Sequence, residues 1–297
     1  MNRVFLLAAL TVLAPGRAGA EFIFGLTNLQ QLVTFDSDTR TVTSTTSLPG
    51  FNISGQFLTS IDVRPATGQL YALSNQNNLF VIDPRTGAST QIGGTLCPAP
   101  AGFIRAIDFN PTVDRIRLVT SSGTNLRVNP DTGAVTVDGN LAFAAGDPNF
   151  GDAPAVVNAA YTNSFPGATA TTLYDLEAGN NILAIQSQPD AGTLNTVGPL
   201  GFDIVSSAGF TGFDISGRTG NAYLVGNSLG GGGLRANSLY TVNLATGAAT
   251  LSGPVSGVNG LFRDIAVANP VAVPVPGGLA LFVGGTASLL LLRRRRG

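Results

Sequence analysis

The chemistry open to this chain is limited by two missing residue types. Its 297 residues include no histidine, and all 16 basic residues are arginine, so lysine is absent too. Without imidazole there is no serine–histidine triad or histidine metal ligand, and without lysine there is no Schiff base. The one cysteine, Cys97, cannot build a zinc site or an internal disulfide, and we expect it to be either buried or a minor liability in an oxidising compartment. Carboxylates, tyrosines, hydroxyls, arginines and amides remain.

Carboxylates recur at one position of a repeated segment, and they are the first candidates for a reaction. Asp62, Asp108 and Asp214 each follow an isoleucine or a phenylalanine, and Asp264 lies in a related segment near the end. Two carboxylates are enough to hydrolyse a glycosidic bond. The candidates for catalytic residues are Asp62, Asp108, Asp214 and Glu177.

A structural role fits these aspartates better than catalysis. A residue that returns in every repeat serves the repeat itself, for instance by accepting hydrogen bonds from a neighbouring turn. Arg105 and Arg263 are close enough in sequence to pair with Asp108 and Asp264. Glu177 lies in a plain hairpin loop, where we expect its side chain to be solvated. The chain is therefore more a binding or structural protein than an enzyme.

Calcium is the one cofactor that the sequence leaves open. Asp147, Asn149 and Asp152 offer three oxygen side chains within six residues. Calcium takes six or more oxygen ligands, and the spacing matches no known loop. Turns capped by Asp and Asn side chains account for the same residues. We expect no bound cofactor.

The fold is indicated by a hairpin that recurs along the chain. Asp-Pro-Arg-Thr-Gly at 83–87 returns as Asn-Pro-Asp-Thr-Gly at 129–133 and as Asn-Leu-Ala-Thr-Gly at 243–247. Asp or Asn caps such a turn, and glycine takes its left-handed position. Gly87 and Gly133 are 46 residues apart, which is a period typical of propeller blades.

Each hairpin follows a strand that carries one of the recurring aspartates, so a unit has four strands. The first unit, residues 22–48, lacks that strand, and a matching segment appears at 262–267 after the last hairpin. Completing one blade from both ends of the chain closes a ring and removes the free edges. The sequence predicts an all-β, five-bladed β-propeller over residues 21–268, with an open sandwich as the alternative.

This pattern resembles the family of domains of unknown function numbered 4394. The resemblance covers most of residues 22–268 and rests on Leu70-Tyr71-Ala72, Ile82-Asp83-Pro84 and Arg105-Ala106-Ile107-Asp108-Phe109. It implies a propeller-like domain outside the cytoplasm that has no established activity.

Both ends of the chain carry export signals. Residues 1–20 combine Arg3, an apolar run over 4–13 and Ala18-Gly19-Ala20, as a secretory signal peptide does. Residues 269–278 form a linker rich in proline and glycine, and an apolar segment follows at 279–292. Counted with Gly277 and Gly278, the segment makes a helix of about 16 residues that spans about 24 Å at ~1.5 Å per residue. This is short of the roughly 30 Å hydrocarbon core, and the arginines of the basic stop after it make up part of the deficit by reaching the headgroups. That stop consists of Arg293, Arg294, Arg295 and Arg296 within residues 293–297.

The tail resembles bacterial sorting signals of the PEP-CTERM type, in particular the variant with the motif Val-Pro-Leu-Pro-Ala. The matching residues are Val273-Pro274-Val275-Pro276-Gly277. The Glu of the main type is absent, and Val275 and Gly277 replace the usual Leu and Ala, which puts the identity of the processing enzyme in doubt. The resemblance implies cleavage by an exosortase-like membrane protease; an uncleaved tail would remain as a membrane anchor.

Charge and signals together suggest the setting in which the protein acts. Six arginines lie in the terminal segments, which leaves ten against 17 acids and a net charge near −7 for the body. An acidic surface repels phosphate backbones, so nucleic acid is not an expected partner. We expect an exported protein of the envelope or extracellular matrix that binds matrix polysaccharide or other exported proteins. A carboxylate-dependent polysaccharide hydrolase or lyase is the alternative.

Overall fold

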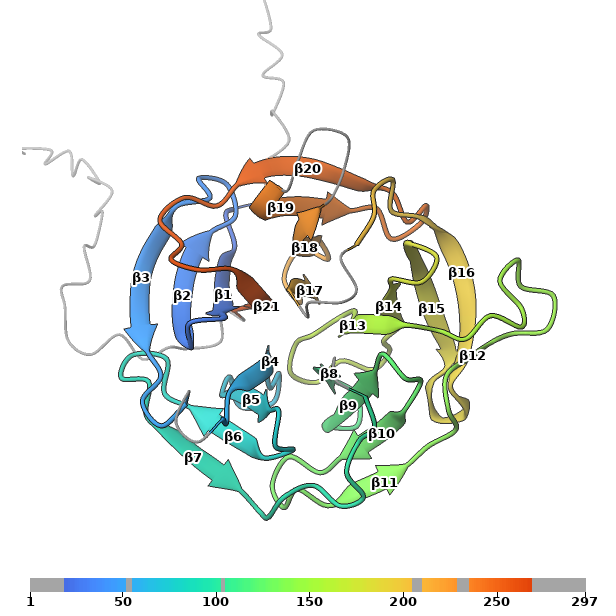
Figure 1. Cartoon of the computed structure of the whole chain (residues 1–297), viewed down its shortest axis with the longest axis horizontal. Helices are drawn as coiled ribbons and strands as arrows, with labels where there is room; N and C mark the ends of the chain where they lie inside the picture. The colour runs from blue at the N-terminus through green and yellow to red at the C-terminus, as the bar shows by residue number, and fades with distance from the viewer. Residues whose placement is uncertain (1–18, 52–54, 103–104, 205–209, 229–234, 269–297) are drawn as a thin grey trace, which may run out of the picture.

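The computed structural model describes residues 19–51, 55–102, 105–204, 210–228 and 235–268, which form a ring of five sheets around a central axis (Figure 1). The five sheets are the blades of a β-propeller, as the repeat predicts, and the sandwich alternative is wrong. The signal peptide, the sorting motif, the apolar segment and the basic stop lie outside the described residues. Within the described ranges, no helix is long and apolar enough to cross a membrane.

Three blades are four-stranded meanders that start at the axis and run outward. Blade 2 contains β4 (Leu58–Val63), β5 (Leu70–Ser74), β6 (Leu79–Ile82) and β7 (Ser89–Ile92). Blade 3 contains β8 (Arg105–Asn110), β9 (Arg115–Thr120), β10 (Asn125–Val128) and β11 (Val135–Val137). Blade 5 contains β17 (Thr211–Ile215), β18 (Ala222–Ser228), β19 (Arg235–Val242) and β20 (Ala249–Pro254).

Blade 4 has a fifth strand that the sequence did not predict. Its meander contains β13 (Val156–Tyr161), β14 (Leu173–Glu177), β15 (Ile182–Gln188) and β16 (Thr193–Pro199), with a 3-10 turn at Pro189–Ala191 between the last two. The extra strand, β12 (Ala142–Phe143), pairs in parallel with the outer edge of β16. Two residues are too few to show a strand pattern in sequence.

Blade 1 closes the ring with strands from both parts of the chain. It contains β21 (Phe262–Val267) on the axis, followed by β1 (Phe22–Thr27), β2 (Gln31–Asp36) and β3 (Val42–Ser47). The late β21 pairs antiparallel with the early β1, placing Ile23 opposite Val267 (Figure 1). The predicted closing strand is thus confirmed.

The recurring turn glycines serve the hairpin and the contact between blades. Asp83 caps its turn by accepting a hydrogen bond from the Arg85 N–H at 2.9 Å, and Gly87 has φ 73°. A Cβ on Gly87 would also lie 2.0 Å from the backbone oxygen of Ser47 in blade 1. The repeat needs glycine here because the turn is left-handed and because the next blade touches it.

The core lies between blades, and blade 1 shows how tightly it is packed. The Phe262 ring is 1% exposed and packs on Gly25 and Phe35, with its centroid 5.6 Å from that of Phe35. A Cβ on Gly25 would lie 2.2 Å from this ring, so only glycine fits beneath it. Cys97, in contrast, is exposed in the connection after β7, so of the two expectations for it the buried one is wrong.

We predict that Phe262→Ala lowers the free energy of unfolding by about 3–5 kcal/mol, because it opens a cavity under the closing strand. Phe22→Ala in the adjacent β1 is the matched control, since Phe22 is 56% exposed, and it should change stability by less than about 1 kcal/mol. Urea unfolding followed by circular dichroism measures both. Equal losses in the two variants would contradict this account of ring closure.

Candidate functional site

The five innermost strands each place one polar side chain at the axis. They are Asp62 in β4, Asp108 in β8, Asn158 in β13, Asp214 in β17 and Asp264 in β21. All five are buried, with at most 5% of the residue surface exposed. The recurring aspartates of the sequence therefore meet in one ring, in which blade 4 contributes an asparagine.

Each member of this axial ring holds the innermost strand of the next blade. The side-chain oxygen or nitrogen forms a hydrogen bond with a backbone group across the blade boundary. The bonds are Ile61 N to Asp264 (2.9 Å), Phe109 N to Asp62 (2.7 Å), Tyr161 N to Asp108 (2.9 Å), Asn158 Nδ2 to Thr211 O (3.1 Å) and Val267 N to Asp214 (2.5 Å). Together they form a closed circuit around the axis.

The carboxylates of the axial ring repel one another. One oxygen each of Asp62, Asp108 and Asp214 lie within 4.8 Å of each other. Burial raises the pKa of Asp62 and of Asp108 well above the usual range, and the neighbouring carboxylates raise both further. Burial also raises the pKa of Asp214 and of Asp264 to about 7. The ring therefore holds protons at neutral pH.

Both oxygens of Asp62 and of Asp214 accept backbone N–H bonds. These bonds occupy the oxygens that a substrate or a metal ion would need. Asp62, Asp108 and Asp214 are the only acids in the described ranges that converge closely enough to hold a metal ion. Three carboxylates fall short of the six or more oxygens that calcium takes, and their burial keeps a polymer substrate away.

Two other predicted residues, Glu177 and Asp147, have local roles. Glu177 is not solvated: it is fully buried, and its carboxylate accepts N–H bonds from Ala155, Gly179 and Asn180 at 2.7–2.8 Å. Asp147 accepts bonds from the backbone N–H and the hydroxyl of Thr196, which attach its turn to β16.

Asn149 and Asp152 belong to the same turn as Asp147. The Asn149 amide donates to the Thr196 hydroxyl at 2.8 Å, while Asp152 is exposed. These contacts describe a turn held to the sheet. Whether the turn binds calcium stays a prediction for titration.

The predicted pairing of Arg263 with Asp264 is wrong. Asp264 accepts hydrogen bonds from Ser60, Ile61, Asn158 and Ile265. Arg263 points away from them and lies over the rings of Phe57 and Phe210. Its guanidinium carbon is 4.6 Å and 5.3 Å from the two ring centroids.

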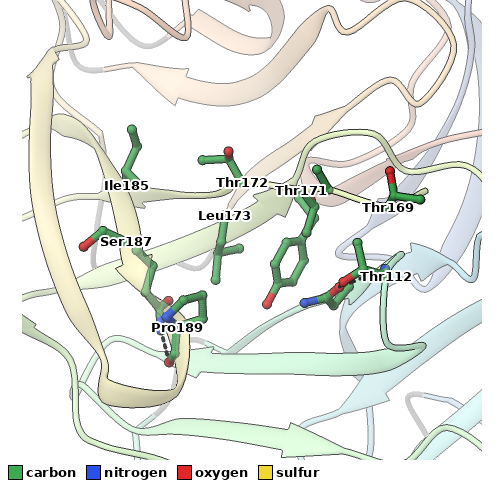
Figure 2. Close-up of a pocket in the computed structure, with 12 residues that line it drawn as sticks. Thr112, Thr169, Thr171, Thr172, Leu173, Ile185, Ser187 and Pro189 are labelled. Carbon is green, nitrogen blue, oxygen red and sulfur yellow. Dashed lines mark hydrogen bonds between the residues drawn. The ribbon is translucent and has the colours of Figure 1, made fainter.

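A recess of about 540 Å³ lies between blades 3 and 4, at the ends of their innermost strands (Figure 2). Hydroxyl groups predominate among its polar side chains and come from Thr112, Thr169, Thr171, Thr172 and Ser187. Asn110 and Gln186 add amides, and Tyr161 adds a phenol ring. No acid or arginine lines it, so the recess suits a neutral ligand that is rich in hydroxyl groups.

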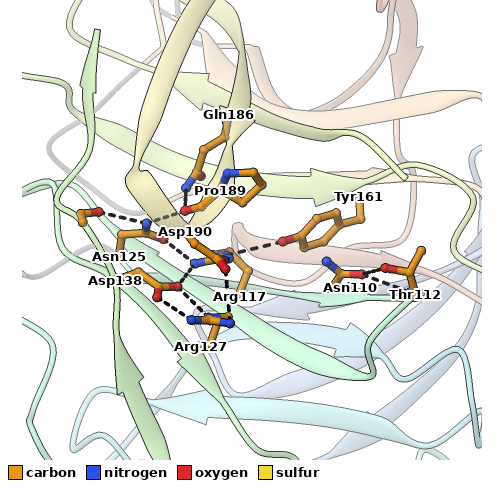
Figure 3. Close-up of polar contacts among 11 residues, drawn as sticks. Asn110, Thr112, Arg117, Asn125, Arg127, Asp138, Tyr161, Gln186, Pro189 and Asp190 are labelled. Atoms are coloured by element: carbon orange, nitrogen blue, oxygen red, sulfur yellow. Dashed lines mark hydrogen bonds and ion pairs between the residues drawn. The ribbon is translucent and has the colours of Figure 1, made fainter. Parts of the chain in front are cut away.

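A second recess of about 240 Å³ shares Tyr161 with the first and is backed by an ion-pair network centred on the buried Arg117 (Figure 3). Arg117, at 2% exposed, donates to Asp138 at 2.5 Å, to Asp190 at 2.9 Å and to the Tyr161 hydroxyl at 3.4 Å. Asp190 belongs to blade 4 and Arg117 to blade 3. The network therefore fixes the wall that the two recesses share.

Two buried groups beside this network have no hydrogen-bond partner among the residues that the structure describes. Both carboxyl oxygens of Asp175 and the Oε1 atom of Gln186 are buried without a hydrogen bond. Asp175 pairs with Ala184 across β14 and β15, which puts it on the same sheet face as Gln186, two residues further on. Burial raises the pKa of Asp175 to about 8, although Arg117 lowers it. Asp175 is thus a neutral acid at pH 7.

The comparisons with known proteins bear on the family. A profile of a domain of unknown function, DUF4394, matches residues 31–266. The chain belongs to the DUF4394 family. A comparison with curated proteins found no match.

Several solved structures resemble the ring of this DUF4394 domain at low identity. A Bacteroides thetaiotaomicron VPI-5482 protein of unknown function is 15% identical, with a TM-score of 0.48, over 85% of this chain and 68% of that one. The Myxococcus xanthus glutaminyl cyclase is 11% identical, with a TM-score of 0.48, over 74% of this chain and 87% of the cyclase chain. A chain of a nidogen/laminin complex is 12% identical, with a TM-score of 0.44, over 84% of this chain and 99% of that one. Such likeness carries no functional conclusion.

We predict that Asp108→Ala lowers the free energy of unfolding by about 1–3 kcal/mol, because the buried Tyr161 N–H loses its acceptor. Asp108→Asn should cost less, since its amide oxygen keeps an acceptor and blade 4 already has Asn158 at this position. Urea unfolding at pH 7 compares the two. An Asn variant as unstable as the Ala variant would show that the charge itself holds the ring.

We predict that stability falls as the pH rises from about 4 to about 8. The folded state holds the Asp175 proton up to pH about 8, whereas the unfolded chain releases it near the ordinary value of 3.8. The folded state therefore binds more protons in this window, and raising the pH favours unfolding. Asp175→Asn should reduce the slope, and Asp38→Asn on an exposed turn should not. Thermal unfolding at several pH values measures this dependence of stability on pH. An unchanged slope in Asp175→Asn would refute the role of Asp175.

Proposed function

We propose that this chain is an exported propeller that binds polysaccharide of the cell envelope or extracellular matrix in the recess between blades 3 and 4. The observation that carries the proposal is the lining of this recess, where hydroxyl and amide side chains surround one aromatic residue. Sugars offer many hydroxyl groups that both donate and accept hydrogen bonds. The buried Oε1 of Gln186 has no protein donor, so a sugar hydroxyl or a water reaching it would satisfy an orphaned acceptor.

The rigidity of the recess supports binding as its role. Its walls come from two blades joined by the Arg117–Asp190 ion pair, in which Arg117 is buried (Figure 3). A site that is already formed loses little conformational entropy when a ligand binds. Surface ion pairs add little to stability, but a buried, hydrogen-bonded arginine costs much when one partner is removed. The pair therefore sets the spacing of the two walls.

Export is proposed from the terminal segments. Residues 1–20 have the pattern of a secretory signal peptide, and residues 269–297 have that of a sorting tail that an exosortase-like protease would recognise. The tail would place the propeller at the envelope, attached by its apolar segment or released after cleavage. Other exported proteins are the alternative partner.

The alternative of a carboxylate-dependent hydrolase is less well supported. No acid lines the larger recess, and the clustered aspartates of the axial ring are at most 5% exposed. Glycoside hydrolysis needs two carboxyl groups on either side of the scissile bond. The described residues bring no such pair to the recess.

We expect the purified protein to be retained on the matrix polysaccharide of the producing organism without releasing reducing ends. Thr169→Trp should reduce retention at least about tenfold, because the indole fills the recess. Thr136→Trp on the exposed edge strand β11 is the control and should bind as the wild type does. Pull-down and a reducing-end assay in the same tube measure both properties.

Each other outcome of this assay contradicts the proposal in a distinct way. Equal retention of both tryptophan variants would place binding elsewhere. New reducing ends that persist through repurification would favour the hydrolase. No retention of the wild type would exclude this polysaccharide and direct attention to exported proteins.

A further inference from the structure

The mouth of the propeller opposite the recess contains an arginine that has no counter-ion among the described residues. The innermost strands all run in the same direction along the axis, so the recess lies where they end, at Asn110 and Tyr161. Arg263 lies near the start of β21, and Phe57 and Phe210 directly precede β4 and β17. These three residues therefore form a cluster at the other mouth, in blades 1, 2 and 5.

Arg263 differs from every other arginine whose side chain the structure describes. Each of the others donates to a carbonyl or pairs with a carboxylate. These contacts are made by Arg40, Arg64, Arg85, Arg115, Arg117, Arg127 and Arg218. Within the described ranges the Arg263 side chain has no hydrogen bond or ion pair; it lies over two aromatic rings, and its Nε is buried without an acceptor.

The aromatic rings orient this guanidinium. The guanidinium lies over both Phe57 and Phe210, which hold it in place, and cation–π attraction offsets part of the loss of hydration. Burial nevertheless lowers the pKa of Arg263, because the charged guanidinium loses hydration that the rings do not fully replace. A guanidinium oriented in this way matches a planar carboxylate, with which it can form two parallel hydrogen bonds.

We propose that Arg263, Phe57 and Phe210 form a binding site for a carboxylate-bearing sugar at this mouth. The guanidinium binds the carboxylate, and the partly exposed phenyl rings pack against the C–H face of the sugar. A neutral sugar leaves the guanidinium without its anion, so the site discriminates acidic from neutral residues. The assignment does not rest on the proposed polysaccharide recess, since the two sites share no residue and lie at opposite mouths.

The test is calorimetric titration of the full chain with sodium glucuronate, with glucose as the neutral counterpart. We expect heat from glucuronate and none from glucose. Arg263→Gln should weaken glucuronate binding about tenfold or more, because the charged hydrogen bonds are lost. Arg263→Lys keeps the charge but not the planar pair of N–H donors, so its affinity for glucuronate should lie between those of the wild type and Arg263→Gln. Arg85→Gln on an exposed turn should bind as the wild type does.

Every other result counts against the site. No glucuronate heat with the wild type, or equal binding by Arg263→Gln, overturns the proposal. Loss of glucuronate binding in Thr169→Trp with retention in Arg263→Gln moves the ligand to the recess. If inorganic phosphate binds more tightly than glucuronate, the assignment to a carboxylate is overturned. If N-acetylalanine binds more tightly than glucuronate, the assignment to a sugar is overturned in favour of a peptide terminus. If Arg263→Gln does not fold, Arg263→Lys compared with Arg85→Lys decides the question.

Discussion

The structure depends on a closed circuit of hydrogen bonds between side chains and backbone at the axis. Each innermost strand has a neighbour in its own blade but no strand ladder to the next blade. Asp62, Asp108, Asn158, Asp214 and Asp264 supply that missing connection. Because the five bonds form a loop, losing one opens the circuit for all five blades. The repeated aspartate thus holds the position of each blade, and ligand binding is left to the loops and mouths.

Asn158 limits the electrostatic cost of this arrangement. Four carboxyl groups share a buried space, in which the charges of Asp214 and Asp264 raise the pKa of Asp62 and of Asp108. A fifth would add repulsion, whereas the Asn158 amide donates to Asp264 at 2.9 Å across the ring. The asymmetry in blade 4 therefore supplies a donor where acceptors are in excess. Blade 4 also carries the neutral acid Asp175 and one wall of the recess, so it departs most from the repeat.

The ring could be predicted from sequence because its determinants are local and periodic. The Thr-Gly turn and the aspartate strand return at blade spacing, and the strand missing from the first unit reappears at the end. The larger recess could not be predicted, since its lining comes from residues 110–112, 161–173 and 185–189, which carry no shared motif. Glu177 was misjudged because the three backbone donors that justify its burial are invisible in sequence. Nearness in sequence suggests a pair of Arg263 with Asp264, but successive residues of a strand point to opposite faces of the sheet.

The split blade has a mechanical consequence. The chain leaves the ring immediately after β21, where the Ala268 N–H donates to Phe22 O at 2.8 Å, and residues 269–297 follow. Any tension on those residues acts first on β21. The ladder of β21 to β1 and its bond to Asp214 then share the load. A pull from the C-terminal side therefore reaches the whole ring through the strand that closes it.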